Sequence, residues 1–373
     1  MKRYAVHVCL VSHQLLPNLL LCCDDTSKPE LVVLLETTVM HNKSQLLSKL
    51  IKQQGCSVEI VNVNSYDVSV IQQLMGNLLN RFSAEIVAVN VTGGNKLMAM
   101  AAFLESWSRN VTTFYVDTDT DTIWQLGEPS QQFPLPDIFK VNLYLQAYGY
   151  RILATGEQSL FPELAQLANE LTDDLNCWGG AIKTLNYYAN KAEYSLNTQL
   201  AERDLANQNF IQLLDKMATT KLLCRDGVRL VFADEKARFF ANGGWLEHHV
   251  LGVVQKLRQD DRIRDVFMNV TLADESGAKN EIDVLFTSRN RLFMIECKTK
   301  NMQTDRARVD DMIYKLESLK GLIGGLYGRA MLLSYFPISN ADQTRCSSYG
   351  LTVVDGRKLK DLRSVLCKWI LDN

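Results

Sequence analysis

Short apolar runs alternate with amphipathic stretches over residues 1–126, and this alternation constrains the fold more than any other feature of the chain. The stretches between the runs carry apolar residues at helical spacing, as in Leu46–Ile51 and Val70–Leu78. The runs themselves have strand length and many β-branched residues; they are Tyr4–Val11, Leu31–Thr37, Ser57–Val63, Glu85–Val91, Thr112–Val116 and Ile123–Leu126. Strands that are apolar on both faces and separated by amphipathic helices predict a parallel sheet with helices on both sides.

This pattern predicts an α/β fold that opens with a doubly wound, Rossmann-like parallel sheet over residues 1–137. Gly127–Asp137 holds three of the seven prolines, so we interpret it as the linker that leaves this domain. Residues 138–240 predict a helical connector. In it, a helix at Asn209–Thr219 precedes a hairpin in Lys221–Phe232, which fits a winged-helix unit and a plain connector equally well. Residues 241–373 return to strands and helices and predict a second mixed α/β domain.

Composition excludes several classes of protein. The formal net charge is −2, so the chain is not coated with basic residues for nucleic acid. Residues 289–373 nevertheless hold 15 Lys or Arg against 9 Asp or Glu, so any polyanion-binding surface is expected in the C-terminal part. The nine cysteines are scattered and form no CxxC pair, which disfavours a zinc ribbon and indicates a reducing, cytoplasmic location. No apolar run approaches the roughly 20 residues of a membrane-spanning helix, so no membrane association is expected.

The sequence NEIDVLFTSRNRLFMIECKTK, residues 280–300, carries the strongest chemical signal. If its two strands are joined by a two-residue turn at Arg289–Asn290, Asp283 lies directly opposite Glu296. Lys298 shares their face, because it is two residues beyond Glu296. Two facing carboxylates repel each other, and a divalent cation with oxygen ligands is the simplest way to offset that repulsion. A longer turn would shift this register.

Glu247 is a further candidate, because it lies beside the apolar stripe of the predicted helix Trp245–Leu257. Asp283 and Glu296 would be metal ligands, Glu247 would either bind the metal directly or support its ligands, and Lys298 would hold or polarise a water molecule. This set suits metal-dependent phosphodiester hydrolysis. The plainer interpretation is a solvated strand face with surface ion pairs, which contribute about 0–1 kcal/mol.

The turn TGGNK ends one predicted strand and begins a helix, at the sheet edge where ligands of parallel α/β folds bind. Glycines allow close approach of the backbone, and N–H groups at a helix start attract anions. The turn lacks both GxGxxG and GxxxxGK[ST], which disfavours a dinucleotide or a hydrolysing P-loop. By itself it is either an anion site or only a turn. The candidate contacts at this edge are Ser12, Thr38, Thr92, Gly93, Gly94, Asn95 and Lys96.

The helix Glu, the strand Asp and the Glu-x-Lys that follows resemble the PD-(D/E)xK nucleases, a restriction-endonuclease-like family. The matching residues are Glu247, Asp283, Glu296 and Lys298, although no Pro precedes Asp283. A TGGxK turn in a Rossmann-like domain ahead of such a domain resembles the CARF (CRISPR-associated Rossmann fold) effector nucleases. That resemblance implies a homodimer activated by a cyclic oligoadenylate, such as cyclic tetra-adenylate, in type III CRISPR antiviral defence. It also implies Mn²⁺ or Mg²⁺ and a single-stranded DNA or RNA substrate, and it assigns the seven edge residues as ligand contacts.

Two other functions fit the same sequence. The chain could sense a ligand and bind nucleic acid through a winged helix without cutting it, which the set Asp283, Glu296 and Lys298 disfavours. It could instead be a constitutive nuclease whose N-terminal domain only dimerises.

Overall fold

The computed structural model describes residues 2–63, 66–159, 161–260, 262–302 and 306–372 and divides into two compact units. The N-terminal unit comprises Met1–Arg151 together with the short segment Ser288–Arg291. The C-terminal unit comprises Ile152–Thr287 and Leu292–Asp372. Each unit has its own sheets and core, so each is described by itself.

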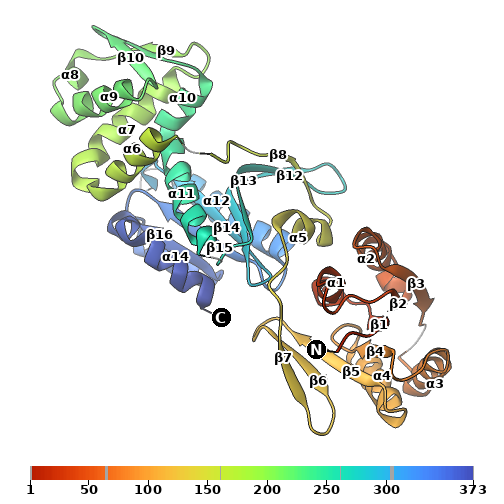
Figure 1. Cartoon of the computed structure of the whole chain (residues 1–373). Coiled ribbons are helices and arrows are strands. Elements are labelled where there is room, and N and C mark those ends of the chain that lie inside the picture. Colours follow the sequence, from red (N-terminus) through yellow and green to blue (C-terminus); the bar gives the residue numbers. More distant parts are fainter. Residues whose placement is uncertain (1, 64–65, 160, 261, 303–305, 373) are drawn as a thin grey trace. The chain divides into compact units, whose positions relative to one another are not determined.

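A seven-stranded sheet in the order β3-β2-β1-β4-β5-β6-β7 forms the centre of the N-terminal unit (Figure 1). Its strands are β1 (Val6–Leu10), β2 (Leu31–Glu36), β3 (Ser57–Asn62), β4 (Val87–Asn90), β5 (Thr112–Asp117), β6 (Thr122–Leu126) and β7 (Gln131–Pro134). The strands from β1 to β5 pair in parallel, which confirms the predicted parallel sheet. Strands β6 and β7 extend it as an antiparallel edge.

Helices cover both faces of this sheet, as the doubly wound fold requires (Figure 1). They are α1 (Leu16–Cys23), α2 (His41–Gln53), α3 (Val68–Leu79), α4 (Lys96–Ser108) and α5 (Val141–Ala147), with a 3₁₀ turn at Thr38–Met40. Helices α3 and α4 pack on the face formed by alternate residues of β1, namely Val6, Val8 and Leu10. The alternation of strand side chains turns Cys9 to the other face, where it lies near Cys22 of α1.

The prediction that Gly127–Asp137 is only a linker is wrong, because Gln131–Pro134 forms the edge strand β7. A proline is tolerated there, since an edge strand leaves one side without ladder hydrogen bonds.

Ser288–Arg291 is bound to the N-terminal unit by side chains of the turn itself. Asn290 Oδ1 accepts hydrogen bonds from the backbone N–H groups of Ile138 (3.0 Å) and Phe139 (3.2 Å). Arg289 donates to Asp121 at 2.7 Å, and Arg291 donates to the Thr118 carbonyl at 2.7 Å. These partners follow β5 and β7, so the segment belongs structurally to residues more than 150 positions earlier in the chain.

The C-terminal unit contains a small, mainly helical module. Its elements are α6 (Pro162–Asp173), α7 (Leu175–Lys191), β9 (Asn197–Gln199), α8 (Glu202–Leu205), α9 (Gln208–Thr219), β10 (Leu223–Asp226) and β11 (Arg229–Phe232). The strands form a sheet in the order β10-β11-β9. From α7 onward, the order helix, strand, two helices and two strands is that of a winged helix, which was one of the two arrangements predicted for the connector.

A six-stranded mixed sheet in the order β16-β15-β14-β13-β12-β8 follows (Figure 1). Its strands are β8 (Arg151–Ala154), β12 (Asp265–Ala273), β13 (Lys279–Ser288), β14 (Arg291–Lys298), β15 (Arg329–Ser334) and β16 (Leu351–Asp355). Its helices are α10 (Glu235–Phe239), α11 (Trp245–Gln259), α12 (Arg306–Gly324), α13 (Asn340–Ser348) and α14 (Leu362–Leu371), with a π-helical turn at Phe240–Gly244 and a 3₁₀ turn at Gly356–Asp361.

Helices α11 and α14 share one core with the six-stranded sheet, where Phe286, Phe293 and Trp369 pack ring against ring. The mixed α/β fold predicted for the C-terminal part is therefore confirmed. Among the described helices of the whole chain, none combines the length and the apolarity needed to span a membrane.

Candidate active site and ligand turn

The TGGNK turn lies at the topological switch point of the N-terminal sheet, where β1 and β4 are neighbours and their connections diverge. A Cβ atom on Gly93 would lie 1.9 Å from the Leu10 carbonyl oxygen and 3.4 Å from Ser12 Oγ. Gly94 has a φ of +72°, in the left-handed region that favours glycine. Both glycines are therefore required by the local geometry, which brings Ser12 and the turn together.

Buried asparagines fix this turn from below. Asn90 Nδ2 donates to Asn18 Oδ1 at 2.8 Å, and Asn18 Nδ2 donates to the Leu10 carbonyl at 2.8 Å. The Thr92 hydroxyl donates to Asn90 Oδ1 at 2.6 Å and accepts from the Val116 N–H at 2.7 Å. The Thr92 side chain therefore holds the turn in place, and the asparagines were not predicted from the sequence.

Asn95 is the N-cap of α4, and its Oδ1 accepts a hydrogen bond from the Met98 N–H at 2.9 Å. Lys96, the first residue of α4, has an exposed side chain. Thr38 is exposed in the 3₁₀ turn that follows β2, at the same carboxyl edge of the sheet. The edge thus offers a helix start, a cation and hydroxyl groups.

Glu36 at the end of β2 was missed by the sequence reasoning. Its side chain is buried, and Oε1 lies 3.0 Å from His41 Nδ1. The buried Oε2 atom has no hydrogen-bond partner among the described residues. The available signal was a carboxylate at the end of the apolar run LVVLLE.

In the C-terminal unit, the turn between β13 and β14 is the predicted two-residue turn. Arg289 and Asn290 both have positive φ, 51° and 54°, as a type I′ turn requires. The Cys297 N–H donates to Asp283 Oδ2 at 2.7 Å, which places the Asp283 carboxylate against β14. Lys298 Nζ donates to Glu296 Oε1 at 2.5 Å and lies 4.0 Å from Asp283 Oδ2. These three side chains therefore meet, as predicted from their spacing.

Glu247 joins them from the first turn of α11, and its side chain is buried. It forms a hydrogen bond with Asn269 of β12, while its buried Oε2 has no hydrogen-bond partner among the described residues. The flanking pairs Met268–Val284 and Val270–Ile282 put Asn269 level with Asp283. Asn269 was not predicted, and its φ of 50° is unusual for a strand residue.

The charged groups of this cluster shift the pKa values of one another. Burial, and next the charge of Asp283, raise the pKa of Glu247 to about 9. Burial, and next the charge of Glu296, raise the pKa of Asp283 to about 6. Burial would lower the pKa of Lys298, but Glu296 and Asp283 together outweigh it and raise that pKa above its usual range. The exposed Lys315 of α12 also acts on Asp283, lowering its pKa slightly. The cluster thus holds more negative charge than one lysine compensates.

A close backbone contact fixes α11 against the end of β14. Gly243, with a φ of +112°, would place a Cβ atom 1.9 Å from Thr299 Oγ1. Asn186 Nδ2 donates to the Thr299 carbonyl at 3.1 Å and lies 3.2 Å from its hydroxyl oxygen. Because Thr299 follows Lys298 directly, this contact positions Lys298 relative to Glu247. None of the three residues that make this contact, Asn186, Gly243 and Thr299, was predicted as a site residue.

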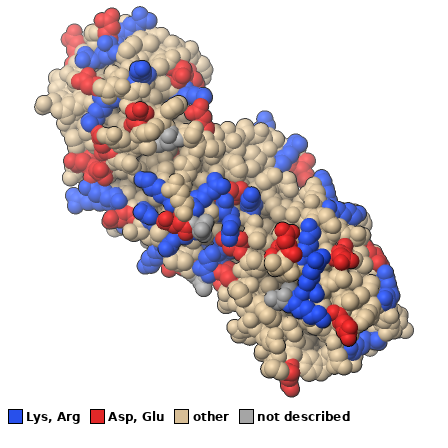
Figure 2. All heavy atoms as spheres, in the orientation of Figure 1, with Lys and Arg blue, Asp and Glu red and all other residues tan. Residues whose placement is uncertain are grey.

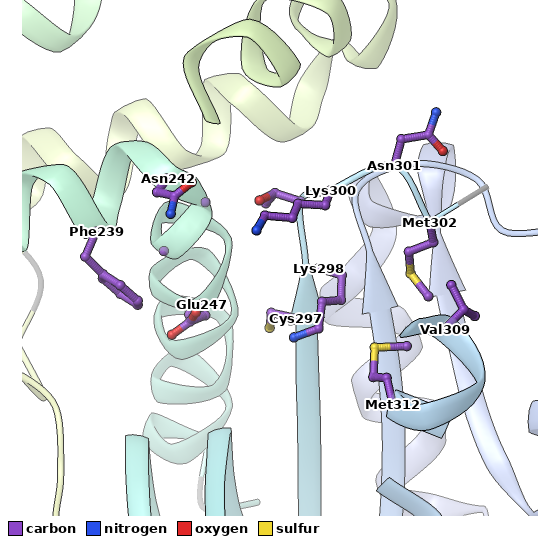
Figure 3. A pocket seen from close by; sticks show the side chains of 13 residues that line it. Phe239, Asn242, Glu247, Cys297, Lys298, Lys300, Asn301, Met302, Val309 and Met312 are labelled. Carbon is purple, nitrogen blue, oxygen red and sulfur yellow. The ribbon is translucent and has the colours of Figure 1, made fainter. Parts of the chain in front are cut away.

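A cavity of about 560 Å³ opens beside the cluster. Figure 3 shows Phe239, Asn242 and Glu247 on its helical side and Lys298 and Lys300 at the end of β14. Two residues of the cluster, Glu247 and Lys298, therefore line a cavity within the C-terminal unit.

A divalent cation is compatible with this cluster on two observations: the unpartnered Glu247 Oε2 and the raised pKa values of two carboxyl groups. The carboxylates of Glu247, Asp283 and Glu296 are not, however, arranged around a common point as metal ligands would be. Among the described residues, no three His, Cys, Asp or Glu side chains lie in metal-binding geometry, and Lys298 instead lies between Glu296 and Asp283. The predicted metal ligands are thus neighbours whose roles stay predictions.

Two family models match the chain. One, described as the Card1 CARF domain, matches residues 6–148, and one described as the Card1-like endonuclease domain matches residues 234–373. Both the predicted catalytic residues and the TGGNK turn lie inside the matched ranges. No curated protein matches the chain.

Solved structures similar to this chain match it over nearly its full length. Protein VC1899 from Vibrio cholerae is 28% identical with a TM-score of 0.90, covering 98% of this chain and 97% of its own. Can2 from Sulfobacillus thermosulfidooxidans, solved in complex with cyclic tetra-adenylate, is 26% identical with a TM-score of 0.81, covering 99% of this chain and 98% of its own.

Proposed function

We propose that this chain hydrolyses phosphodiester bonds with a divalent cation, and that it does so when a cyclic oligoadenylate binds its N-terminal unit. The chain belongs to the CARF-domain effector nucleases with a C-terminal restriction-endonuclease-like domain. Its substrate is single-stranded DNA, RNA or both, and its role is type III CRISPR antiviral defence in the cytoplasm. The observation that carries the catalytic half of this proposal is the cluster in which the buried Glu247 and the half-buried Asp283 and Glu296 surround Lys298.

Each residue of the cluster has a role that follows from its position. Glu247, Asp283 and Glu296 would hold Mn²⁺ or Mg²⁺, which when bound supplies positive charge to the phosphate and lowers the pKa of a water molecule. Lys298, oriented by its hydrogen bond to Glu296, donates to the attacking water or to a phosphate oxygen. Asn269 holds the Glu247 carboxylate toward the sheet, and the Gly243–Thr299 contact fixes the approach of α11.

A metal titration tests the catalytic half. The activated protein should cut a single-stranded oligonucleotide with Mn²⁺ or Mg²⁺ and lose that activity in excess chelator. Calorimetry of Mn²⁺ binding gives a readout besides activity, since Asp283→Asn and Glu247→Gln should each weaken it. Cleavage that continues in chelator would refute metal dependence.

The ligand half of the proposal is supported by the TGGNK turn and by the related Can2, whose structure contains cyclic tetra-adenylate. The turn offers N–H groups at the start of α4 and the Lys96 ammonium to a phosphate. Ser12, Thr38, Thr92, Gly93, Gly94, Asn95 and Lys96 remain the proposed contacts. The test is the cleavage rate of the full chain with and without cyclic tetra-adenylate. An equal rate at every ligand concentration would indicate a constitutive nuclease instead.

Helix α4 supports the proposed homodimer. Leu97, Met100, Leu104 and Trp107 recur at helical spacing along it, and all four are exposed. Because α4 starts at Lys96, a second copy packed on this stripe would bring two ligand turns near a two-fold axis, which suits a cyclic ligand of the same symmetry. Met100→Glu should convert the dimer to a monomer in sedimentation velocity.

The winged-helix order of α7 to β11 is the observation that favours the alternative, a ligand-responsive regulator that binds nucleic acid without cutting it. On the face drawn in Figure 2, Lys and Arg side chains lie interspersed with Asp and Glu over both units. Such a mixed surface argues less for broad nucleic-acid binding than for a local site. Tight binding of an oligonucleotide without cleavage at any metal concentration would favour the regulator.

A further inference from the structure

One wall of the cavity beside the catalytic cluster is an aromatic ring, Phe239, that is not part of the hydrophobic core. Ala237 and Phe240, two residues before and one residue after Phe239, belong to the hydrophobic core, whereas Phe239 is only half-buried and lines the cavity. A Cβ atom on Gly244 would lie 2.3 Å from Phe239 Cε1, so the missing side chain of Gly244 leaves room for the ring. Met302 and Met312 contribute apolar side chains to the same cavity. An aromatic ring on an open cavity wall provides a surface on which a planar group can stack.

A polar group lies next to this ring. Asn242 lines the cavity, and its buried Oδ1 has no hydrogen-bond partner among the described residues. A buried amide oxygen without a partner costs stability, so its presence is explained if a ligand donates a hydrogen bond to it. An asparagine amide both donates and accepts, which matches the paired donor and acceptor on the edge of a nucleobase.

Positive charge completes the cavity. Lys300 is exposed at the end of β14 and lines the cavity, and Figure 3 shows its side chain directed toward the side of α11. Lys298 and Glu247 line the same cavity, so whatever occupies it lies beside the proposed catalytic groups. The volume of about 560 Å³ falls within the range of roughly 300–1,000 Å³ for small-molecule sites, which a nucleotide suits.

We propose that this cavity binds one unpaired nucleotide of the substrate next to the scissile phosphate, with the base stacked on Phe239 and hydrogen-bonded to Asn242 and its phosphate near Lys300. This inference rests on the proposed nuclease function. It specifies the substrate class further, because a base inside a duplex is stacked and paired and cannot enter the cavity without leaving the helix. The site therefore selects single strands or flipped nucleotides.

The test uses the full-length protein with cyclic tetra-adenylate and Mn²⁺ on single-stranded oligonucleotides that carry one abasic residue, moved position by position past a single cleavage site. With the wild type, kcat/KM should fall about ten-fold when the abasic residue occupies one position beside the cut, since stacking on an aromatic ring stabilises a bound base by that order. Phe239→Ala should lower kcat/KM on the intact strand and remove the dependence on that position. Phe239→Tyr should retain both. Asn242→Ala should reduce the preference among the four bases at the same position.

The exposed Phe161 at the start of α6 offers a matched control, and Phe161→Ala should leave the abasic profile unchanged. A flat profile for the wild type, or a profile unchanged in Phe239→Ala, would overturn the proposal while leaving the nuclease function intact. A second measurement does not depend on cleavage. A single strand with 2-aminopurine should lose fluorescence on binding the inactive Glu296→Gln protein, and adding Phe239→Ala should abolish that quenching. Quenching that is equal with and without Phe239 would also overturn it.

Discussion

The TGGNK turn of the N-terminal unit and the cluster of Glu247, Asp283, Glu296 and Lys298 in the C-terminal unit differ in how their polar groups are paired. At the turn, the side chains of Asn90, Thr92 and Asn95 are engaged in hydrogen bonds within the protein, so the turn keeps its shape without help. In the cluster, Glu247 Oε2 has no partner among the described residues, and the carboxyl groups of the buried Glu247 and the half-buried Asp283 have raised pKa values. The turn is preorganised to offer backbone N–H groups, while the cluster stores repulsion that a cation would relieve.

This difference indicates which kind of substitution should impair function most at the turn and which in the cluster. At the turn, shape is decisive, so adding a methyl group should do more harm than removing a side chain. In the cluster, charge is decisive, so a substitution that preserves shape and removes charge should abolish function while leaving the fold intact.

The largest expected effect is in the cluster. Glu296→Gln and Lys298→Ala should each lower the ligand-activated cleavage rate at least a hundred-fold, because each removes a charge that contacts the reacting groups. Both should bind cyclic tetra-adenylate as the wild type does, which calorimetry would measure. Glu281→Gln, an exposed carboxylate on the same strand as Asp283, is the control and should cut normally. Full activity in Lys298→Ala would remove the catalytic assignment.

The next effect is at the turn. Gly93→Ala should weaken cyclic tetra-adenylate binding at least ten-fold, because the added Cβ would lie 1.9 Å from the Leu10 carbonyl oxygen and must displace the turn. Gly127→Ala is the matched control, since a Cβ there has no neighbour within 4 Å. Isothermal titration of both variants checks this, and equal affinity would mean that the turn does not contact the ligand.

Acid should act on the N-terminal unit through His7. Burial lowers the pKa of His7 from 6.5 to about 4. Between these values the unfolded chain binds a proton that the folded chain does not, so stability is full above pH 6.5 and is lost as pH falls toward 4. The free energy of unfolding should drop by about 2 kcal/mol from pH 7 to pH 5 on this account. Urea midpoints at both pH values should show a smaller drop in His7→Phe than in His13→Phe, which replaces an exposed histidine. Equal drops would exclude His7 as the source.

The smallest effect separates shape from charge at one residue. Asn95→Ala should lower stability by about 1 kcal/mol, because α4 loses its cap. Asn95→Asp keeps a capping oxygen and should preserve stability, but its negative charge should weaken binding of a phosphate-bearing ligand. Thermal unfolding and calorimetry of the pair measure both quantities. Unchanged binding in Asn95→Asp would place the phosphates away from the start of α4.

The sequence allowed the parallel sheet and the hairpin of β13 and β14 to be predicted, because both depend on local periodicity and one short turn. Asp283, Glu296 and Lys298 could be placed on one face for the same reason. The residues that position them could not, since Thr299 meets Gly243 and Asn186 across 56 and 113 residues of chain. Strand β7 was missed because the three prolines of Gly127–Asp137, one of which is Pro134 at the end of the strand, outweighed a weak edge pattern. Glu36, Asn269 and Asn242 gave no periodic signal in the sequence. In the structure, Glu36 and Asn242 are recognised by buried side-chain oxygens without a partner among the described residues, and Asn269 by its hydrogen bond with Glu247.

The membership of Ser288–Arg291 in the N-terminal unit has a consequence for how such proteins can be recombined. Exchange of sensors between relatives cannot proceed through a single crossover at the end of residue 151, because the hairpin turn would then meet a foreign surface in place of Asp121 and the Ile138–Phe139 backbone. A viable chimaera must transplant the four turn residues with residues 1–151, which makes this sensor a discontinuous module. Residues 1–151 and Ser288–Arg291 should therefore be retained together during evolution. The same holds when this unit is engineered for a new ligand specificity.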